Sequence, residues 1–395
     1  MIKYTNNELD RLLNLSEFDL DYSNLEDSLK DLTKLAAKIA GTEISLINIV
    51  DSLTQWTISS HGIDLKQMER EDSVCQYTIL DNVPFEINDL SLDDRFKEKF
   101  YVKDTLNLRY YFGIPLTTDK GHNIGALCVL DDFAKAINPE KIELLKIIAD
   151  EIVNKLKAIK VIENLKNKIQ ENTETHKRVA HDIRGPIGGI ISLAQVISMQ
   201  GEENNLEEVL MFINLIQKSG NTLLELADEI LSVEQFNKIK SDEFNLLMLK
   251  EKLETLYAPQ VYNKCINFEI NINKEIAEVP FFKNKLLQII GNLISNSIKF
   301  TPLNGTIKVD LNLAEEDNHK HLKIKVSDTG VGMNDAAIAE ILDGTAVSTD
   351  GTSGEIGYGF GLALVKHLIA SLKGTLNINS TLNEGTVFEI SIPQK

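Results

Sequence analysis

The chain has 395 residues, which is too long for one ordinary hydrophobic core and predicts two or three domains. Its composition, 43% hydrophobic and 25% charged, is that of a globular protein. A formal net charge of −18 argues against a nucleic-acid surface, which needs a basic patch. The sequence contains no run of 18 apolar residues and no signal-peptide core, so we expect a cytoplasmic protein without a membrane span.

The cysteines are odd in number and far apart, at Cys75, Cys128 and Cys265. This pattern is typical of buried thiols in a reducing compartment. It predicts neither a disulfide framework nor a zinc site.

The first part of the chain, to about residue 155, has a mixed α and β character. The apolar run Ile44–Val50 has strand composition, and a second strand-like run spans 121–132. Between them, the polar and aspartate-rich stretch 88–96 is typical of a loop.

A long helix is predicted from Pro139 onward. Steps of three and four between apolar residues average close to the coiled-coil value of 3.5. The apolar positions are Leu145, Ile148, Ile152, Leu156, Ile159, Ile162, Leu165 and Ile169. No glycine or proline interrupts the pattern between Lys141 and Arg184, so we expect a stiff helix that pairs with a partner.

The same periodicity continues to Ile197, and a second apolar stripe runs from Leu206 to Ile230 after a polar loop at 200–205. Two such stripes joined by a short loop form a helical hairpin. One hairpin cannot bury its own seam, so two chains would complete a four-helix bundle as a homodimer.

From about residue 241 the pattern becomes α/β. Alternating apolar residues predict strands around 266–270, 307–311 and 322–326. Helical stretches lie between them at 283–299 and 359–373. The predicted fold class is therefore multidomain α/β, with an α+β domain before the hairpin and an α/β sandwich after it.

His181 begins the segment HDIRGP on the first hairpin helix. It lies about 100° from the apolar seam and should face solvent. A neutral imidazole is a nucleophile near pH 7, and Asp182 can accept the proton of its other ring nitrogen. Pro186 removes a backbone donor and should bend the helix.

A polar face is predicted on the helix within GNLISNSIKFT, residues 291–301. Asn292, Asn296 and Lys299 share that face through steps of four and three. Amide oxygen suits Mg²⁺, and an ammonium group suits phosphate.

Glycine-rich segments follow in a fixed order. Asp328 ends a strand and is followed by Gly330 and Gly332, so its carboxylate can accept a hydrogen bond from an adenine amino group. A later cluster opens a helix and exposes N–H groups to a polyphosphate. This cluster comprises Gly357, Gly359, Gly361 and Leu362, and a last glycine turn leads to Thr386.

These segments resemble the H, N, G1, G2 and G3 boxes of sensor histidine kinases, over about residues 170–393. The resemblance implies a dimeric hairpin bundle followed by an α/β sandwich of the Bergerat type that binds Mg·ATP. It implies His181 as phosphoacceptor with Asp182 as general base, and phosphoryl transfer to an aspartate on a separate response-regulator receiver domain. Asn296 would bind Mg²⁺, Lys299 would contact phosphate and Asp328 would select adenine. The other positions expected to bind ATP are Asn292, Gly330, Gly332, Gly357, Gly359, Gly361, Leu362 and Thr386.

The region from about 20 to 155 resembles a GAF sensor domain through SVCQYTI, INDLSLDDRF, RYYFGIPL and GALCVLDD. The resemblance implies control by a small-molecule or protein signal, which the sequence does not name. The expected division is a sensor domain at 1–155, a signalling helix at 140–178, a phosphotransfer hairpin at 170–240 and a catalytic domain at 241–395.

Two departures from the kinase pattern stand out. Gly185 occupies the position where a threonine or asparagine often serves dephosphorylation of the regulator, which puts phosphatase activity in doubt. The stretch AAIAEILDGTAVS between the G1 and G2 boxes lacks the usual phenylalanine, so lid docking should differ.

Two other functions share some of these features. ATPases of the gyrase or mismatch-repair kind, and serine kinases that regulate sigma factors, carry a catalytic glutamate where this chain has Asn292, and an amide cannot act as a base. A catalytically degenerate signalling scaffold would keep the fold and lose the chemistry. The presence of every box residue with a chemical role favours the kinase.

Overall fold

The computed structural model describes all residues except 1–6, 23–24, 105, 201–204, 234–242, 283–284, 317–318, 344–350, 353–359 and 395. The chain forms two compact units, one of residues 1–160 with 243–395 and one of residues 161–242. We call residues 7–160 and 243–394 the N-terminal and C-terminal lobes of the first unit, and residues 161–242 the hairpin unit. Within the described ranges, no helix combines the length and apolar character needed to cross a membrane.

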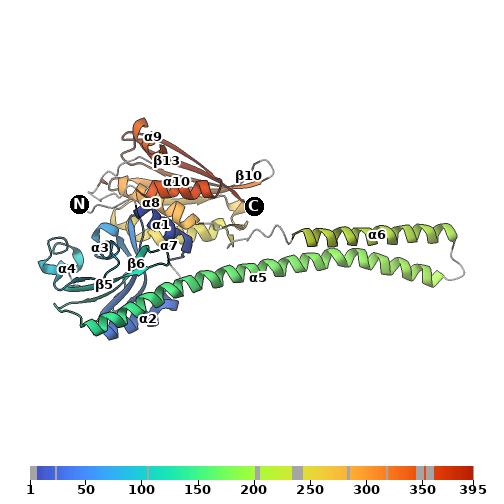
Figure 1. Ribbon diagram of the computed structural model, residues 1–395. Helices are drawn as coiled ribbons and strands as arrows, with labels where there is room; N and C mark the ends of the chain where they lie inside the picture. Colours follow the sequence, from blue (N-terminus) through green and yellow to red (C-terminus); the bar gives the residue numbers. More distant parts are fainter. Residues whose placement is uncertain are drawn as a thin grey trace. The chain divides into compact units, whose positions relative to one another are not determined.

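The N-terminal lobe is built on a six-stranded antiparallel sheet with the strand order β3-β2-β1-β6-β5-β4 (Figure 1). Its strands are β1 (Ile44–Val50), β2 (Thr54–His61), β3 (Gln67–Glu69), β4 (Phe85–Ile87), β5 (Tyr110–Thr117) and β6 (Asn123–Asp131). Its helices are α1 (Asn7–Phe18), α2 (Glu26–Ala40), η1 (Arg70–Asp72), α3 (Cys75–Thr78), η2 (Leu90–Leu92) and α4 (Phe100–Lys103). The two predicted strands are confirmed as β1 and β6, and the predicted loop at 88–96 contains only the short η2.

Strand β1 separates two hydrophobic cores because successive side chains of a strand point to opposite faces. Ile47 and Ile49 belong to the core that includes α2 and the beginning of the long helix. Leu46 and Val50 belong to the other core, which lies under α3 and α4. Both faces of this sheet are therefore covered.

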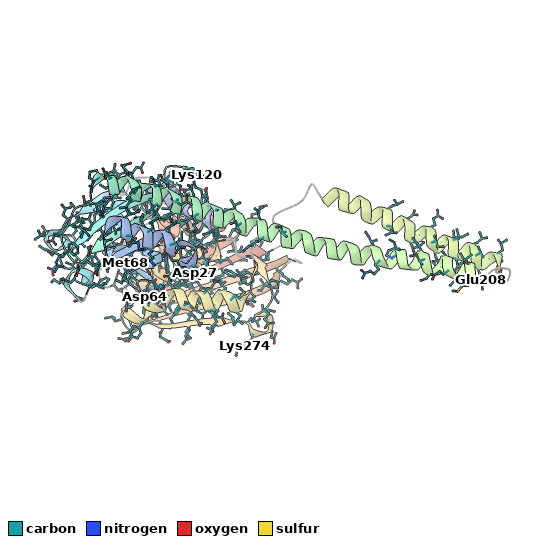
Figure 2. All side chains as sticks on the ribbon, turned by 90° about the horizontal axis from the view of Figure 1, so that it is seen from below. Asp27, Asp64, Met68, Lys120, Glu208 and Lys274 are labelled. Atoms are coloured by element: carbon teal, nitrogen blue, oxygen red, sulfur yellow. The ribbon has the colours of Figure 1, made fainter. Side chains whose placement is uncertain are left out.

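Helix α5 (Pro139–Gln200) is one continuous helix of 62 residues, as the unbroken apolar pattern predicts. It continues past Pro186, so the proline does not end it. Leu145, Ile148 and Ile152 are buried in the N-terminal lobe. Helix α6 (Leu206–Val233) returns alongside the C-terminal part of α5, which confirms the predicted hairpin (Figures 1 and 2).

The hairpin unit leaves its apolar residues uncovered. Of the described side chains between 161 and 224, not one is fully buried. Those that are large, apolar and exposed include Ile187, Ile191, Met199, Leu206, Leu210, Met211, Ile213 and Leu224. A seam of this kind needs a second surface, which supports the predicted bundle of two chains.

The C-terminal lobe contains a five-stranded sheet with the order β12-β13-β11-β10-β8, in which β8 and β10 are parallel and the other neighbours are antiparallel. Its strands are β8 (Asn267–Ile272), β10 (Thr306–Glu316), β11 (His319–Asp328), β12 (Thr375–Thr381) and β13 (Gly385–Gln394), with β7 (Glu243–Phe244) and β9 (Phe281–Phe282) as a separate pair. Its helices are α7 (Leu246–Asn263), η4 (Lys274–Ile276), α8 (Leu286–Phe300), α9 (Asp335–Asp343) and α10 (Gly361–Ser371). Strands β8, β10 and β11 and helices α8 and α10 confirm the predicted elements.

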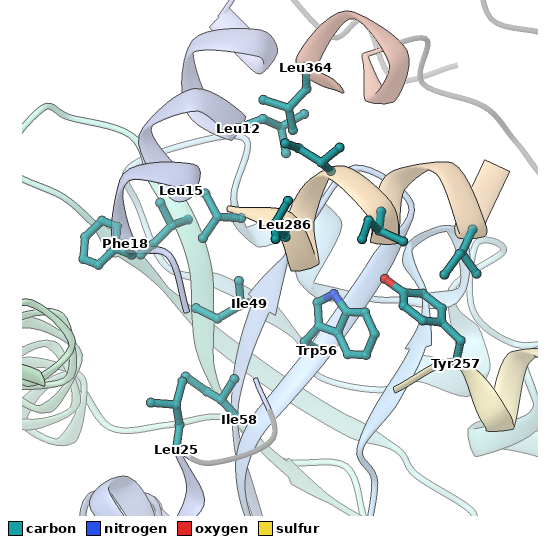
Figure 3. Close-up of a cluster of buried hydrophobic side chains, with 14 of the residues drawn as sticks. Leu12, Leu15, Phe18, Leu25, Ile49, Trp56, Ile58, Tyr257, Leu286 and Leu364 are labelled. Atoms are coloured by element: carbon teal, nitrogen blue, oxygen red, sulfur yellow. The ribbon is translucent and has the colours of Figure 1, made fainter. Parts of the chain in front are cut away.

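The two lobes share one hydrophobic core (Figure 3). Leu12 of α1 and Trp56 of β2 lie in the same cluster as Leu286 of α8 and Leu364 of α10. Trp56 meets Tyr257 of α7 edge to face, with the ring centroids 5.8 Å apart.

Polar contacts surround the shared core. The Gln67 amide donates to the carbonyl oxygen of Leu256 at 2.9 Å, and Lys252 forms an ion pair with Asp21. The sequence did not predict this association, because each lobe carries a complete amphipathic pattern of its own.

The prediction of buried thiols is confirmed for Cys75 and Cys128 and wrong for Cys265, which is exposed. Cys265 has a φ of 51° at the turn between α7 and β8. A turn of this kind lies at the surface, whatever the polarity of the residue that occupies it.

Replacing both Ile187 and Ile213 by lysine should convert a dimer of the full chain into monomers. Burial of each isoleucine is worth about 1.5–3 kcal/mol, so the dissociation constant should rise at least about 100-fold. Sedimentation velocity at micromolar concentration measures this. Leu92→Lys is the control, because Leu92 is also exposed but lies in the N-terminal lobe. A parent chain that sediments as a monomer would refute the bundle.

Candidate functional site

Helix α8 carries the predicted polar face into a buried setting. Asn292 is 4% exposed, and both ends of its amide are engaged. Its nitrogen donates to the carbonyl oxygen of Gln288 at 2.8 Å, and its oxygen accepts from the hydroxyl of Ser52 at 2.5 Å. Ser52 follows strand β1 in the N-terminal lobe, so that lobe contributes directly to the surroundings of Asn292.

Asn296 lies one turn further along α8. Its amide nitrogen is buried and has no hydrogen-bond partner among the described residues. A Cβ added at Gly361 would stand 3.5 Å from this nitrogen and 3.1 Å from the Asn292 oxygen. The start of α10 therefore approaches both asparagines closely, and an unsatisfied amide, which costs about 1–3 kcal/mol, fits a site that takes a polar ligand.

The end of α8 is held by a lysine that sequence reasoning missed. The Nζ atom of Lys264 donates to the carbonyl oxygens of Ile298 and Lys299 at 2.8 and 2.9 Å, and to the hydroxyl of Thr352 at 2.8 Å. A cation is favourable at a helix C-terminus because the unsatisfied carbonyl groups there are negative. Lys264 thereby ties Thr352, in the segment between α9 and α10, to the end of α8, next to the buried Lys299.

Asp328 ends β11 and is fixed by three donors. Its carboxylate accepts from the backbone N–H groups of Gly330 at 3.0 Å and Thr386 at 3.1 Å, and from the Ser297 hydroxyl at 2.8 Å. Burial raises the pKa of this carboxyl above its usual value, although the three hydrogen bonds act in the opposite direction. Ser297 was not predicted, although it lies beside Asn296 in the same motif.

Gly332 is required by the backbone. Its φ is +63°, and a Cβ there would stand 1.9 Å from the carbonyl oxygen of Thr381. The chain after Asp328 thus passes against the β12–β13 turn, where the hydroxyl of Thr386 meets that of Ser380 at 2.8 Å.

The structure therefore brings together two of the predicted groups. Asn292, Asn296 and Gly361 form one, with Leu362 half-buried beside it, and Asp328, Gly330 and Thr386 form the other. Gly357 and Gly359 lie outside the described residues. His181 and Asp182 belong to α5, and their side chains lie outside what the structure describes. Gly185 belongs to the same helix.

The C-terminal lobe thus combines a mixed sheet, a carboxylate at a strand end, a helix that carries two asparagines, and close approaches of glycine backbone. Residues 283–395 match the family model described as histidine kinase-, DNA gyrase B- and HSP90-like ATPase. The C-terminal lobe therefore contains an ATPase domain of this kind. The match covers less than half of the chain.

The chain is 34% identical over 226 residues to the autoinducer 2 sensor kinase/phosphatase LuxQ of Vibrio vulnificus, covering 55% of this chain and 26% of that protein. It is 36% identical over 128 residues to a cyclic di-GMP phosphodiesterase of Pseudomonas aeruginosa, covering 32% of this chain and 22% of that protein. The chain thus spans about a quarter of the length of these curated relatives. The solved catalytic domain of histidine kinase ThkA is 22% identical, with a TM-score of 0.33, over 39% of this chain and 95% of that one. A TM-score this low adds nothing to the argument on fold.

Gly332→Ala should lower the free energy of unfolding by about 3 kcal/mol or more, because the added methyl group meets a backbone oxygen at a left-handed φ. Gly121→Ala is the matched control: its φ is +79°, but nothing lies within 4 Å of the added Cβ. That variant should lose only about 1 kcal/mol. Chemical denaturation followed by circular dichroism compares the two, and equal losses would contradict the steric argument.

Proposed function

We propose that this chain is a sensor histidine kinase, which uses Mg·ATP to phosphorylate His181 and passes the phosphoryl group to an aspartate of a separate response regulator. The observation that carries the proposal is the arrangement of buried polar groups on α8 and at the end of β11, within the segment that matches the ATPase family. The similarity to a sensor kinase/phosphatase supports the same class.

The residues present fit Mg·ATP as substrate. The buried amide nitrogen of Asn296 has no partner among the described residues and can donate to a phosphate oxygen, whereas the amide oxygen of the same side chain is a suitable Mg²⁺ ligand. We propose that Lys299 contacts phosphate and that Asp328 accepts a hydrogen bond from the adenine amino group. The Asp328 carboxylate is held by Ser297 and Gly330 and can accept a further hydrogen bond. Mg²⁺ would neutralise developing charge on the phosphoryl oxygens.

The proposed chemistry is one displacement at phosphorus. A ring nitrogen of His181 forms an N–P bond as the bond between the γ-phosphorus and the bridging oxygen breaks, and ADP leaves. Asp182 accepts the proton from the other ring nitrogen, which keeps the nucleophile electron-rich. The hairpin unit would present His181 as part of a homodimer.

The contacts of Asn292 favour this reaction over direct ATP hydrolysis. A gyrase-type ATPase needs a carboxylate base at this position. Here the amide is fixed at both ends by Gln288 and Ser52, and it has no basic atom. A scaffold without activity is the remaining alternative, and it is distinguished by a labelling experiment.

His181→Gln should abolish incorporation of phosphate from γ-labelled ATP. The parent should carry an acid-labile and base-stable phosphoramidate. The matched control is His176→Gln, five residues earlier on the same helix, which should label like the parent. Label that persists in the His181 variant would place the phosphoacceptor elsewhere, and an unlabelled parent with bound Mg·ATP would favour the scaffold.

We further propose that the N-terminal lobe is a GAF-like sensor that controls the kinase through the shared core of the two lobes. The support is the hydrogen bond from Ser52 to Asn292, reinforced by the contact of Trp56 with Tyr257. With the lobes in contact, the Ser52 hydroxyl competes with nucleotide for the Asn292 amide. A signal that loosens this contact would release the amide.

Ser52→Ala should therefore tighten the binding of a non-hydrolysable ATP analogue about two- to ten-fold, because a hydrogen bond of this kind is worth about 0.5–1.5 kcal/mol. Isothermal titration calorimetry on the full chain measures the change. Ser91→Ala is the control, since its hydroxyl bonds only to Asp89 within the same lobe. Unchanged or weaker binding of the ATP analogue by the Ser52 variant would show that Ser52 does not compete with nucleotide.

A further inference from the structure

Two cysteines that are 53 residues apart in the sequence meet inside the N-terminal lobe. The sulfur atoms of Cys75, at the beginning of α3, and Cys128, in β6, are 3.4 Å apart. They are 2% and 1% exposed. A disulfide bond needs a separation of about 2.05 Å, so the two sulfurs have little more than one ångström to travel.

The pair has polar surroundings that an ordinary apolar core does not provide. The side-chain nitrogen of Asn48 donates to both sulfurs, at 3.3 Å to Cys75 and 3.2 Å to Cys128. The Tyr111 hydroxyl donates to the Cys75 sulfur at 3.4 Å and is itself bonded to Thr78 at 2.7 Å. These donors stabilise negative charge on sulfur.

The two thiols are not equivalent. Burial raises the pKa of the Cys75 thiol, but the hydrogen bonds from Cys128, Tyr111 and Asn48 outweigh it and bring the pKa to about 7. Burial and the neighbouring Cys75 raise the pKa of Cys128 above its usual value. The Tyr111 hydroxyl donates to the Cys75 sulfur in addition to Asn48, which favours the thiolate on Cys75, and the thiolate is the reactive form.

An apolar pocket leads to the pair. It has an empty volume of about 470 Å³, part of which is open to solvent, and its lining includes Asn48, Cys75 and Cys128 among apolar side chains. The side-chain oxygen of Asn48 is buried and has no hydrogen-bond partner among the described residues. A small molecule with a hydroxyl donor would satisfy this acceptor beside the sulfurs.

A resident metal ion does not fit the pair. The described residues contain no group of three or more His, Cys, Asp or Glu side chains that could hold one. Two thiols with one reactive member and one resolving member suit oxidation.

We propose that Cys75 and Cys128 form a reversible disulfide when hydrogen peroxide enters this pocket. The Cys75 thiolate attacks one peroxide oxygen, the O–O bond breaks, and the departing hydroxide takes up a proton to leave as water. The product is a sulfenic acid on Cys75. The Cys128 sulfur then attacks the Cys75 sulfur, the S–S bond forms, and the hydroxyl group leaves with the Cys128 proton as a second water. Two thiols are oxidised by two electrons and one peroxide is reduced, and a dithiol reductant reverses the change.

The test uses the full chain, treated with hydrogen peroxide, alkylated under denaturing conditions and digested without reduction. Mass spectrometry should find the Cys75 and Cys128 peptides joined, with the loss of two hydrogen atoms, and dithiothreitol should restore both free thiols. The exposed Cys265 provides an internal reference for non-selective oxidation. The proposal would be overturned if Cys75 and Cys128 were both still free to be alkylated in samples in which Cys265 was already oxidised. It would also be overturned if Cys75 were converted to a sulfinic acid without forming the cross-link.

Variants separate the two roles. Cys128→Ala should stop at a sulfenic acid on Cys75, which dimedone captures, whereas Cys75→Ala should give no dimedone adduct on Cys128. Cys265→Ala should form the cross-link like the parent. Asn48→Ala should slow cross-linking at least about ten-fold by raising the pKa of Cys75, and this loss should diminish at higher pH. Since the cross-link is measured first in the parent, a variant that fails to fold does not decide the outcome. The result is independent of kinase activity.

Discussion

The burial of helix α8 is the constraint on which this structure depends. Leu286, Ile290 and Leu293 of α8 are fully buried, and most of its other side chains are buried too. The helix contacts β10, β11, α7 and α10, and it also belongs to the core shared with the N-terminal lobe. Polar groups on such a helix each cost about 1–3 kcal/mol unless they are paired. The partners of these groups come from several other elements. Ser52 donates to Asn292, Asp328 accepts from Ser297, and Lys264 donates to the last carbonyl groups of the helix. The amide nitrogen of Asn296, near the start of α10, has no such partner among the described residues.

A buried cluster of charges in the N-terminal lobe lies beside the turn that carries Ser52, the residue that contacts α8. Glu8 of α1 accepts from Arg11 and Arg70, both at 2.7 Å, while Arg11 also donates to the carbonyl oxygen of Val50 and Arg70 to that of Asp51. Burial raises the pKa of Glu8, but the two arginines outweigh it and bring the pKa to about 2. Because folding lowers the pKa of Glu8 from its ordinary value of 4.5, the ionised Glu8 stabilises the fold at pH values above 4.5. This contribution to the free energy of unfolding is lost as the pH falls toward 2. Because Arg11 and Arg70 bond both to Glu8 and to the backbone at Val50 and Asp51, they hold α1 against the turn that carries Ser52.

Local patterns predicted the elements of the fold well and their association poorly. The apolar run Ile44–Val50 predicted β1 to the residue, because a strand that is buried on both faces has a nearly continuous apolar sequence. The apolar period of three and four residues predicted the two hairpin helices. The sequence also predicted the positions of the asparagines on one helix and of Asp328 at a strand end, because both follow from local spacing. Ser52 and Lys264 were missed, because each acts on residues that are distant in the sequence and neither has a periodic neighbourhood. The meeting of Cys75 with Cys128 depends on how α3 packs on β6, which no local pattern contains.

Strand β1 connects these long-range features. Asn48 points from β1 to the two sulfurs, and four residues later Ser52 bonds to Asn292. The strand is central in its sheet, paired with β2 on one side and β6 on the other, so it moves as part of a hydrogen-bonded layer. The β1–β2 pairing shifts register between Ile47 and Asn48, and an irregularity of this kind is where a strand bends most easily. Disulfide formation must shorten the distance between the two sulfurs by more than an ångström, which displaces either Cys128 or α3. The Asn48 amide donates to both sulfurs. Strand β1 therefore joins the two thiols, through Asn48, to the turn whose Ser52 contacts α8.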